Sequence, residues 1–488
     1  MILRFYSYKD LHGRPLTSES CINKITKIII SNSRNHWLRF LTELSKKVKF
    51  WTEYGDIIRF QKDNFGVNFP DVIVINRRAV LVLTQFLFSI NEDEFSSTSK
   101  SFNSKDLGFL FLIINEYIDK KETISLRKSL KKEIFFTSFK IIHTSFNISD
   151  IKILYFLFNK FHNFIRNSKN IDKYNEILIK ELGCSLQSFS EVLNYLMGID
   201  KLNNKFYELV DIQSIKCESI DFLWKKRENK LPIPFEYSFL EKYPIVKADG
   251  KYYIYDNTNL FLSTIKKVFS VLADDEVYDF RHDFGQNIVE PIIKNELSDI
   301  FLDSDIEIIN VSSRKFQYGD FGLCFGNYIF LFEIKSIYFK PRIRYSMDYD
   351  YFISAFDGKF IKKSGVEQQV KRIKDIDNNF EHFKQLSKLK NEKYKVFPII
   401  LSFDDSIQAL GCNWYVNNRF SIFKRILIKN LKNIEISENM CIISFTELIL
   451  LKEKYSNPKS RIELLLEFLK RKTDLKPFRE YMETRPSI

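Results

Sequence analysis

The sequence has few cysteines and histidines, and they form no recognisable ligand or disulfide pattern. Six cysteines are scattered along 488 residues without a C-x-x-C pair or a paired Cys/His spacing, and the six histidines include no i, i+4 pair. Zinc sites need clustered Cys and His ligands, and disulfide frameworks are typical of short secreted chains. The sequence therefore argues against both kinds of cross-link.

Long apolar runs are also missing. The longest, Ala79–Ile90 and Leu107–Ile114, fall short of the roughly 20 residues with which a helix crosses a bilayer. The first ten residues, MILRFYSYKD, contain no apolar segment followed by a small-residue cleavage site. We expect a cytoplasmic protein with no membrane partner.

Motifs for several chemistries are absent. There is no G-x-x-x-x-G-K-[ST] or G-x-G-x-x-G, so NTP-driven translocation is not built into the chain. No G-x-S-x-G elbow or Cys–His nucleophile pattern occurs.

Positive charge, in contrast, is plentiful: the sequence has 75 Lys and Arg against 62 Asp and Glu, a net charge of +13. This balance favours a polyanionic partner such as nucleic acid, although a lysine-rich composition also follows from an AT-rich genome.

The length and pattern of the chain predict several domains. A chain of 488 residues with 45% hydrophobic content is globular and too long for one ordinary core. Residues 1–225 show apolar positions at helical intervals and predict a mostly α-helical N-terminal region. Residues 226–278 predict a connector, with a β-hairpin turning at Ala248-Asp249-Gly250 and a short helix over 259–272.

Residues 279–455 predict an α/β domain, and residues 456–488 a basic C-terminal helix and tail. The predicted elements are, in order, a helix over 283–300, strands over 306–311, 321–325 and 328–339, a helix beginning near 364, and strands over 396–403 and 441–445. Capping boxes at Asp283/Gln286 and Ser364/Glu367 indicate where the two helices begin. Pro398 is unusual in a strand that reads as buried on both faces.

Three charged residues in this domain point to one site. Asp320 follows a glycine, and Glu333-Ile334-Lys335 ends a strand-like run of apolar residues. Because strand side chains alternate between faces, Glu333 and Lys335 share a face. A hairpin turning near Gly326-Asn327 brings Asp320 to the same place, where two carboxylates can bind Mg²⁺. Lys335 can then orient a water or stabilise charge on a phosphate. The alternatives are two surface acids on a hairpin and a purely structural Glu333–Lys335 ion pair.

The run GD…FEIKS (Gly319-Asp320 and Phe332–Ser336) resembles the PD-(D/E)XK nuclease superfamily, with Gly-Asp in place of Pro-Asp. The predicted helix, three strands, helix and strand over about 279–405 match the αβββαβ core of that superfamily, the restriction-endonuclease-like fold. The resemblance implies metal-dependent hydrolysis of phosphodiester bonds, usually of DNA, with Mg²⁺ as cofactor and Mn²⁺ as the alternative.

The resemblance implies roles for two further residues. Glu290 matches the acidic residue on the first helix of the superfamily and would complete a metal site with Asp320 and Glu333. Pro291 beside it requires the helix either to bend there or to start near Glu290. Gln369 lies on the apolar stripe of the second helix, where relatives place a glutamine near the metal or the phosphate; the alternative is a buried structural amide.

The lysines and arginine that follow Gln369 form a basic stretch that can contact phosphates. They are Lys371, Arg372, Lys374, Lys384, Lys388, Lys390 and Lys393. We therefore expect a Mg²⁺-dependent nuclease, most simply an endonuclease acting on double-stranded DNA. By analogy, a nuclease with a large extra domain belongs in restriction or anti-phage defence. Two alternatives are a nucleic-acid-binding or assembly protein that keeps the fold without cutting, and a nuclease that is silent until its N-terminal helices bind a regulatory protein or a second copy.

Overall fold

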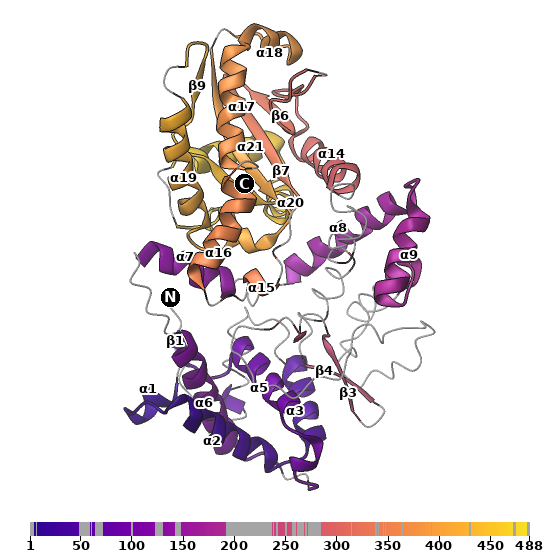
Figure 1. Ribbon diagram of the computed structural model, residues 1–488, viewed down its shortest axis with the longest axis vertical. Helices are drawn as coiled ribbons and strands as arrows, with labels where there is room; N and C mark the ends of the chain where they lie inside the picture. The colour runs from indigo at the N-terminus through magenta and orange to yellow at the C-terminus, as the bar shows by residue number, and fades with distance from the viewer. Residues whose placement is uncertain are drawn as a thin grey trace. The chain divides into compact units, whose positions relative to one another are not determined.

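The computed structural model describes most of residues 4–47, 72–122, 130–141, 148–191, 285–471 and 475–485, with short pieces within 59–63 and 237–271. The chain divides into two compact units (Figure 1). Unit 1 comprises residues 1–125, 144–158 and 165–272, and unit 2 comprises 126–143, 159–164 and 273–488. The described N-terminal part is mostly helical, and a mixed sheet lies in the C-terminal half.

Unit 1 is built from helices with two small two-stranded sheets. The helices are α1 (Tyr8–His12), α2 (Ser18–Ile30), α3 (Arg34–Lys47), α5 (Arg77–Ser89), α6 (Ser104–Glu122), α9 (Ile171–Leu182) and most of α8 (Ile148–Arg166). The hairpin predicted in the connector is confirmed, since β3 (Ile245–Ala248) pairs antiparallel with β4 (Lys251–Ile254). β1 (Arg4–Phe5) pairs parallel with β2 (Val72–Ile73). The helix predicted over 259–272 lies almost entirely outside the described residues. None of the described helices is both long and apolar enough to span a membrane.

Unit 2 is organised around a six-stranded mixed sheet. Its strands are β5 (Ile306–Ile309), β6 (Phe321–Phe325), β7 (Tyr328–Lys335), β8 (Tyr394–Ser402), β9 (Ile434–Ile436) and β10 (Cys441–Ser444). β5, β6 and β7 form an antiparallel meander, and β7, β8 and β10 run parallel, giving the order β10-β8-β7-β6-β5. β9 pairs with the first part of β8. The strands predicted from the sequence are thus present, although β7 ends at Lys335 and not at Phe339.

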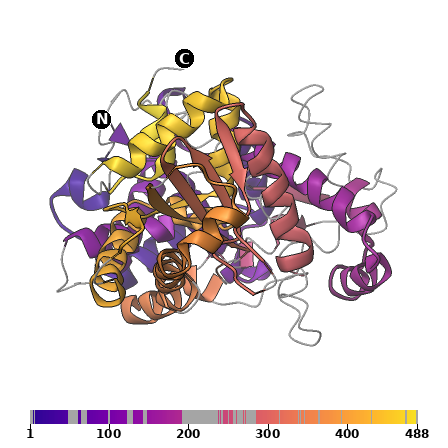
Figure 2. The ribbon, with the colours of Figure 1, turned by 90° about the horizontal axis from the view of Figure 1, so that it is seen from above.

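Helices cover both faces of the sheet. The described helices of unit 2 are α7 (Leu130–Ile141), α14 (Glu290–Phe301), α15 (Pro341–Arg344), α16 (Tyr349–Phe356), α17 (Val366–Asn378), α18 (Phe380–Leu386), α19 (Cys412–Leu427), α20 (Phe445–Lys454), α21 (Pro458–Lys470) and α22 (Phe478–Glu483). α17 and α19 lie side by side, and α20 and α21, yellow in Figure 2, lie on the opposite face of the sheet. Apolar residues of α17 pack on β7 in one core cluster that includes Ile373, Ile376, Ile329 and Leu331.

Pro398 lies in the middle of β8, and the pairing of its neighbours explains why it is tolerated. Lys395 N donates to Asn327 O and Phe403 N to Lys335 O, each at 2.9 Å. Because N–H groups alternate sides along a strand, that of residue 398 would point away from β7. On that side β9 pairs only as far as Val396 and β10 begins at Ile399. The missing donor of Pro398 therefore falls in a gap of the ladder.

The starts of the two helices near the site differ from the expected ones. α14 begins at Glu290 with Pro291 in its first turn, where proline is tolerated, after one π-helical turn over Gly285–Val289. The helix therefore starts near Glu290, which is one of the two possibilities left open by the sequence. α17 begins at Val366 with Gly365 as its N-cap. The predicted capping residues Asp283 and Ser364 lie outside the described residues.

The domain boundaries predicted from the sequence differ from this division at both ends of unit 2. α7 belongs to unit 2, where Phe135 packs on Phe352 and Phe356 and stacks with Tyr415. The C-terminal helices belong to it as well, since Arg461 of α21 donates to the carbonyl of Ile300 of α14 at 2.5 Å. A pattern of residue types does not reveal such long-range packing.

Candidate active site

The antiparallel register of β6 and β7 brings Asp320 next to Glu333. Phe321 pairs with Phe332, so in this antiparallel register Asp320 stands opposite Glu333. Asp320 is fixed there because its N donates to Phe332 O at 3.1 Å and its Oδ2 accepts from Ile334 N at 2.9 Å. Gly319 allows the close approach, since a Cβ atom at this position would lie 2.6 Å from the side chain of Leu331. The predicted hairpin with its turn at Gly326-Asn327 is confirmed.

Glu333 and Lys335 lie on the face of β7 that α17 covers. The ammonium of Lys335 donates to Glu333 Oε1 at 2.6 Å. The side chains of Asp320, Glu333 and Lys335 are only 7%, 3% and 11% exposed. Charged groups this buried must be paired, because removing an unpaired charge from water is costly. The surface-acid alternative is therefore wrong for this site.

Arg372 of α17 joins the two carboxylates. Its Nη1 atom donates to Glu333 Oε2, and both Nη1 and Nη2 lie 3.5 Å from Asp320 Oδ1. Gln317 Nε2 adds a further bond to Asp320 Oδ1 at 3.1 Å. The site thus contains two carboxylates, one ammonium and one guanidinium, and its formal charges cancel.

Glu290 lies at the margin of this group. It stands in the first turn of α14, and its Oε2 atom is 3.5 Å from Lys294 Nζ. Burial raises the pKa of Glu290, and the negative charge of Asp320 raises it further. The charge of Glu290 in turn acts on Lys335 and Arg372. The predicted fourth acidic position is therefore within electrostatic reach of the site, although its own ion pair is with Lys294.

The two cations of the site are affected mainly by burial. Burial lowers the pKa of the Lys335 ammonium, while the charges of Asp320 and Glu290 oppose that effect. Burial likewise lowers the pKa of the Arg372 guanidinium, against the opposing effects of Asp320 and Glu290. In both cases the low dielectric of the interior outweighs the attraction of the carboxylates.

Of the two glutamines of α17, Gln368 and not Gln369 contacts the carboxylates of the site. Gln369 is fully buried on the apolar stripe of α17, and its Nε2 donates to the carbonyl of Leu331 at 3.2 Å and lies 3.5 Å from that of Ile399, so its amide bonds the backbone of β7 and β8. Gln369 Oε1 has no hydrogen-bond partner within the described part of the chain. Gln368 lies beside the site: with its amide nitrogen toward Glu333 it donates to Oε1 at 3.1 Å, and its oxygen accepts from Arg372 Nη2 at 2.7 Å.

The donor chemistry of this site fits a hard divalent cation. Asp320 Oδ1 and Glu333 Oε2 both bond to Arg372 Nη1, so their oxygens already converge on one positive group. Mg²⁺ needs only one or two carboxylates because it keeps several of its waters. Among the described residues, however, no three His, Cys, Asp or Glu side chains gather closely enough to form a metal cluster. Asp320 and Glu333 are the residues that would hold the cation, with Glu290 further away.

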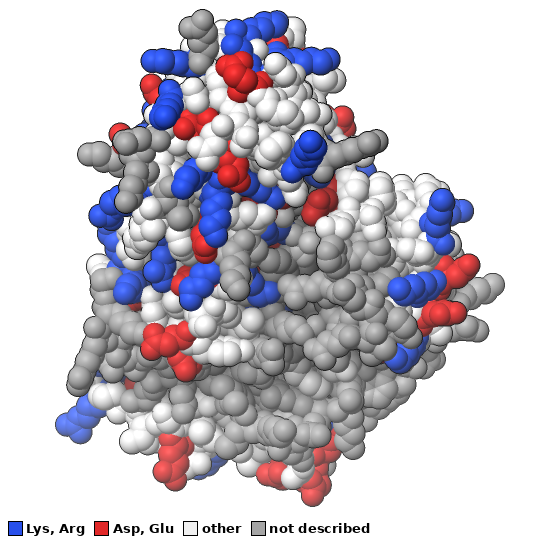
Figure 3. Space-filling view, turned by 45° about the horizontal axis from the view of Figure 1, so that its top comes forward, with Lys and Arg blue, Asp and Glu red and all other residues white. Residues whose placement is uncertain are grey.

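The basic stretch divides into a buried part and an exposed part. Arg372 is buried in the site, whereas Lys371, Lys374, Lys388, Lys390 and Lys393 are exposed. Two of the exposed lysines have acidic partners: Lys371 lies 2.6 Å from Glu367, and Lys390 lies 3.6 Å from Glu307. In the upper part of Figure 3, which is unit 2, Lys and Arg side chains are interspersed with acidic ones.

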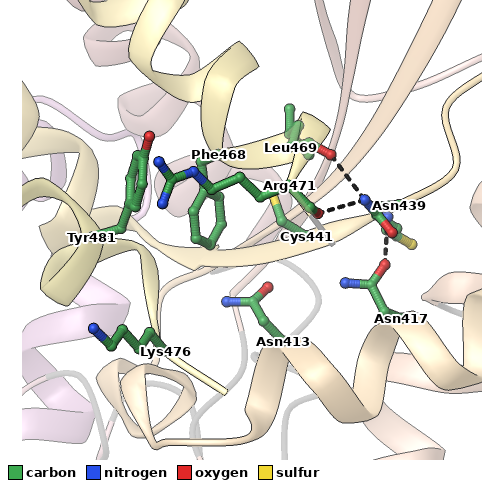
Figure 4. A pocket seen from close by; sticks show the side chains of 10 residues that line it. Asn413, Asn417, Asn439, Cys441, Phe468, Leu469, Arg471, Lys476 and Tyr481 are labelled. Atoms are coloured by element: carbon green, nitrogen blue, oxygen red, sulfur yellow. Dashed lines mark hydrogen bonds between the residues drawn. The ribbon is translucent and has the colours of Figure 1, made fainter. Parts of the chain in front are cut away.

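A separate hollow of about 30 Å³ lies at the edge strand β10 (Figure 4). Two buried asparagines of α19 line it and satisfy the strand edge, since Asn417 Oδ1 accepts from Met440 N at 2.7 Å and Asn413 Oδ1 from Ile442 N at 2.8 Å. Its volume is that of one or two water molecules. The hollow is therefore too small for a nucleotide. The two asparagines occupy backbone donors at the edge of the sheet, which hinders pairing with a strand of another chain.

Arg372 and Gln368 are the site residues that the sequence analysis did not identify as such. For Arg372 a signal existed: it stands three residues after Gln369 and one before Ile373, on the buried stripe of α17. An arginine on an apolar stripe needs a buried acidic partner. For Gln368 the sequence carries no comparable signal.

No protein-family model, curated protein or solved structure matches this chain. Its function must therefore be inferred from the geometry of the site itself.

Proposed function

We propose that this protein is a metal-dependent nuclease that hydrolyses phosphodiester bonds, with a restriction-endonuclease-like core in unit 2. The observation that carries the proposal is the meeting of Asp320, Glu333 and Lys335, with Arg372, at the carboxyl end of β7. The order of elements supports it as well: α14, β5, β6, β7, α17 and β8 occur in the order αβββαβ, with α15 and α16 inserted before α17 and α18 after it.

The chain's own residues have distinct tasks in this proposal. A divalent cation held by Asp320 and Glu333 would lower the pKa of a bound water and stabilise negative charge on the phosphate. Asp320 is held in place by the N–H of Ile334. Lys335, 2.6 Å from Glu333, positions the attacking water or bonds a phosphate oxygen through its ammonium. Gln368 orients Glu333.

Double-stranded DNA is the proposed substrate, and the exposed lysines near α17 would contact its phosphates. We place the protein in the cytoplasm and, by analogy with nucleases that carry a large extra domain, in restriction or anti-phage defence. Unit 1 would then bind a regulatory partner or a second copy. This part is tested by comparing cleavage by the purified protein alone with cleavage after addition of host-cell extract or phage components.

A second candidate is a nucleic-acid-binding or assembly protein that does not cut. One observation favours it: Lys335 and Arg372 already neutralise both carboxylates, so the site is electrically satisfied without a metal. In that case neither Mg²⁺ nor the substitution Asp320→Ala would change the affinity for nucleic acid.

The test is cleavage of supercoiled plasmid with Mg²⁺, with Mn²⁺ and with EDTA. The proteins compared are the wild type, Lys335→Ala and the control Lys459→Ala, which removes the same charge from a partly exposed side chain of α21 that pairs with Asp305. The proposal expects metal-dependent nicking by the wild type and the control, and a loss of about 100-fold or more in Lys335→Ala. Equal cleavage by wild type and Lys335→Ala would remove the mechanism, and parallel RNA and single-stranded DNA substrates define the substrate class.

A further inference from the structure

The guanidinium of Arg372 stands where a cation shared by the two carboxylates would bind. Its Nη1 bonds Glu333 Oε2 and lies 3.5 Å from Asp320 Oδ1. These are also the oxygens that converge for a divalent ion, so the carboxylate pair cannot accept a metal in this geometry while the guanidinium remains.

We propose that Arg372 is an internal competitor of the metal: it neutralises Asp320 and Glu333 until a divalent cation binds, and it then turns out toward the substrate phosphate. This inference rests on the proposed function, because it takes the same carboxylates as the metal ligands. It adds a positioning residue and a form of regulation that the proposed function does not contain.

Energetics explain why the carboxylates need such a counter-ion. Asp320 and Glu333 are 7% and 3% exposed and face one another across β6 and β7. Two buried like charges without a cation repel one another and lack the hydration that would compensate them. Lys335 bonds only Glu333 among the described carboxylates, at 2.6 Å, so Arg372 alone bonds both.

The attachment of Arg372 also allows it to leave. It is held by side chains of the site, and a divalent ion brings twice the charge to the same oxygens. A guanidinium presents its donors in a planar fork that matches phosphate oxygens. A nucleic-acid phosphate close to the site would therefore favour the released state, and metal and nucleic acid would each increase the affinity for the other.

The test is calorimetric titration of Mg²⁺ into the full-length protein without nucleic acid. In Arg372→Gln the competitor is gone, so we expect Mg²⁺ to bind about tenfold or more tighter than in the wild type. Lys371→Gln is the matched control: it removes the same charge from the neighbouring residue, which is exposed and paired with Glu367 at 2.6 Å. A general change in net charge would alter both variants alike, whereas we expect less than about a twofold change in Lys371→Gln.

Thermal unfolding with and without Mg²⁺ distinguishes a change in metal affinity from a general loss of folding. Arg372→Gln leaves the carboxylates facing one another, so its melting temperature should fall without metal and should rise with Mg²⁺ by more than that of the wild type. Arg372→Lys keeps the charge with a single ammonium and is expected to bind Mg²⁺ with an affinity between the two.

The outcomes separate this inference from the proposed function. Binding that depends on Asp320, shown by its loss in Asp320→Asn, but that is equally tight in wild type and Arg372→Gln, overturns the competition and leaves the metal site standing. Tighter binding by Arg372→Gln with no cleavage by any protein supports the competition and contradicts the nuclease. Absence of Asp320-dependent binding even in Arg372→Gln contradicts both.

Discussion

Glu333 and Glu447 are both buried glutamates near the carboxyl ends of the parallel strands of the sheet, but they are held by different kinds of partner. β7 and β10 run parallel to β8, and Lys335 and Ser444 both pair with Ser402. Glu447, in the first turn of α20, accepts from two backbone N–H groups, those of Ser444 and Arg479, each at 2.7 Å. Glu333 is held by the side chains of Lys335 and Arg372.

The kind of partner decides what each glutamate can do. Backbone donors are fixed by the helix and turn that carry them, so nothing can replace them at Glu447 without local unfolding. Side-chain cations can rotate away, which leaves the oxygens of Glu333 open to a metal. Glu447 therefore serves as a structural cap of α20, and Glu333 is available for chemistry.

The largest difference is expected when both glutamates are replaced by glutamine. Glu333→Gln places an amide that carries donors against the donors of Lys335 and Arg372, so plasmid cleavage should fall by about 100-fold or more. Glu447→Gln should retain cleavage within about threefold at temperatures where it is folded, because the bonds of Glu447 to described residues are to Ser444 and Arg479, away from the site. Cleavage assays of both variants measure this difference, and equal losses would erase the distinction.

The pH dependence of stability should reveal the burial of Glu447. Burial raises the pKa of Glu447 from 4.5 to about 7, although the N–H groups of Ser444 and Arg479 oppose the rise. Because the folded pKa is the higher one, its contribution to stability is complete below about pH 4.5 and is lost as the pH rises through about 7. We expect the free energy of unfolding to fall by on the order of 3 kcal/mol over this window. Denaturant melts at several pH values should show that slope in the wild type and not in Glu447→Gln.

Gly319 tests how closely the loop before Asp320 must approach β7. In Gly319→Ala the new methyl group would lie 2.6 Å from the buried Leu331 side chain, so the free energy of unfolding should fall by about 1–3 kcal/mol. Cleavage should fall with it, because Asp320 is displaced. The matched control is Gly358→Ala, where a methyl group meets nothing within 4 Å. Stability and cleavage unchanged in Gly319→Ala would contradict the close packing.

The smallest effect is expected at the two glutamines. Gln369 combines a buried oxygen without a partner among the described residues with one bond to the Leu331 carbonyl, so Gln369→Met should lower the free energy of unfolding by only about 1 kcal/mol and leave cleavage nearly intact. Gln368→Met removes a bond to Glu333 and should reduce cleavage about tenfold. The reverse order would restore the catalytic role that the family resemblance implies for Gln369.

The elements of unit 2 that form from local patterns were predictable from the sequence. The β6–β7 hairpin follows from the two apolar runs and the glycine turn between them, and its register brings Asp320 to Glu333. Residues positioned by packing between distant segments were less predictable. Arg372 was grouped with a basic stretch that can contact phosphates, because a charge pattern does not show what lies opposite a helix. The contact of Gln368 with Glu333 was missed because the sequence does not give the angle at which α17 crosses the sheet.

The most direct measurement is a crystal structure of the protein soaked in Mn²⁺, with anomalous diffraction to locate the ion. The account predicts a peak about 2.0–2.2 Å from oxygens of both Asp320 and Glu333, with the Arg372 guanidinium moved away from them. Arg372 still bonded to both carboxylates at saturating Mn²⁺, with no peak between them, would contradict it.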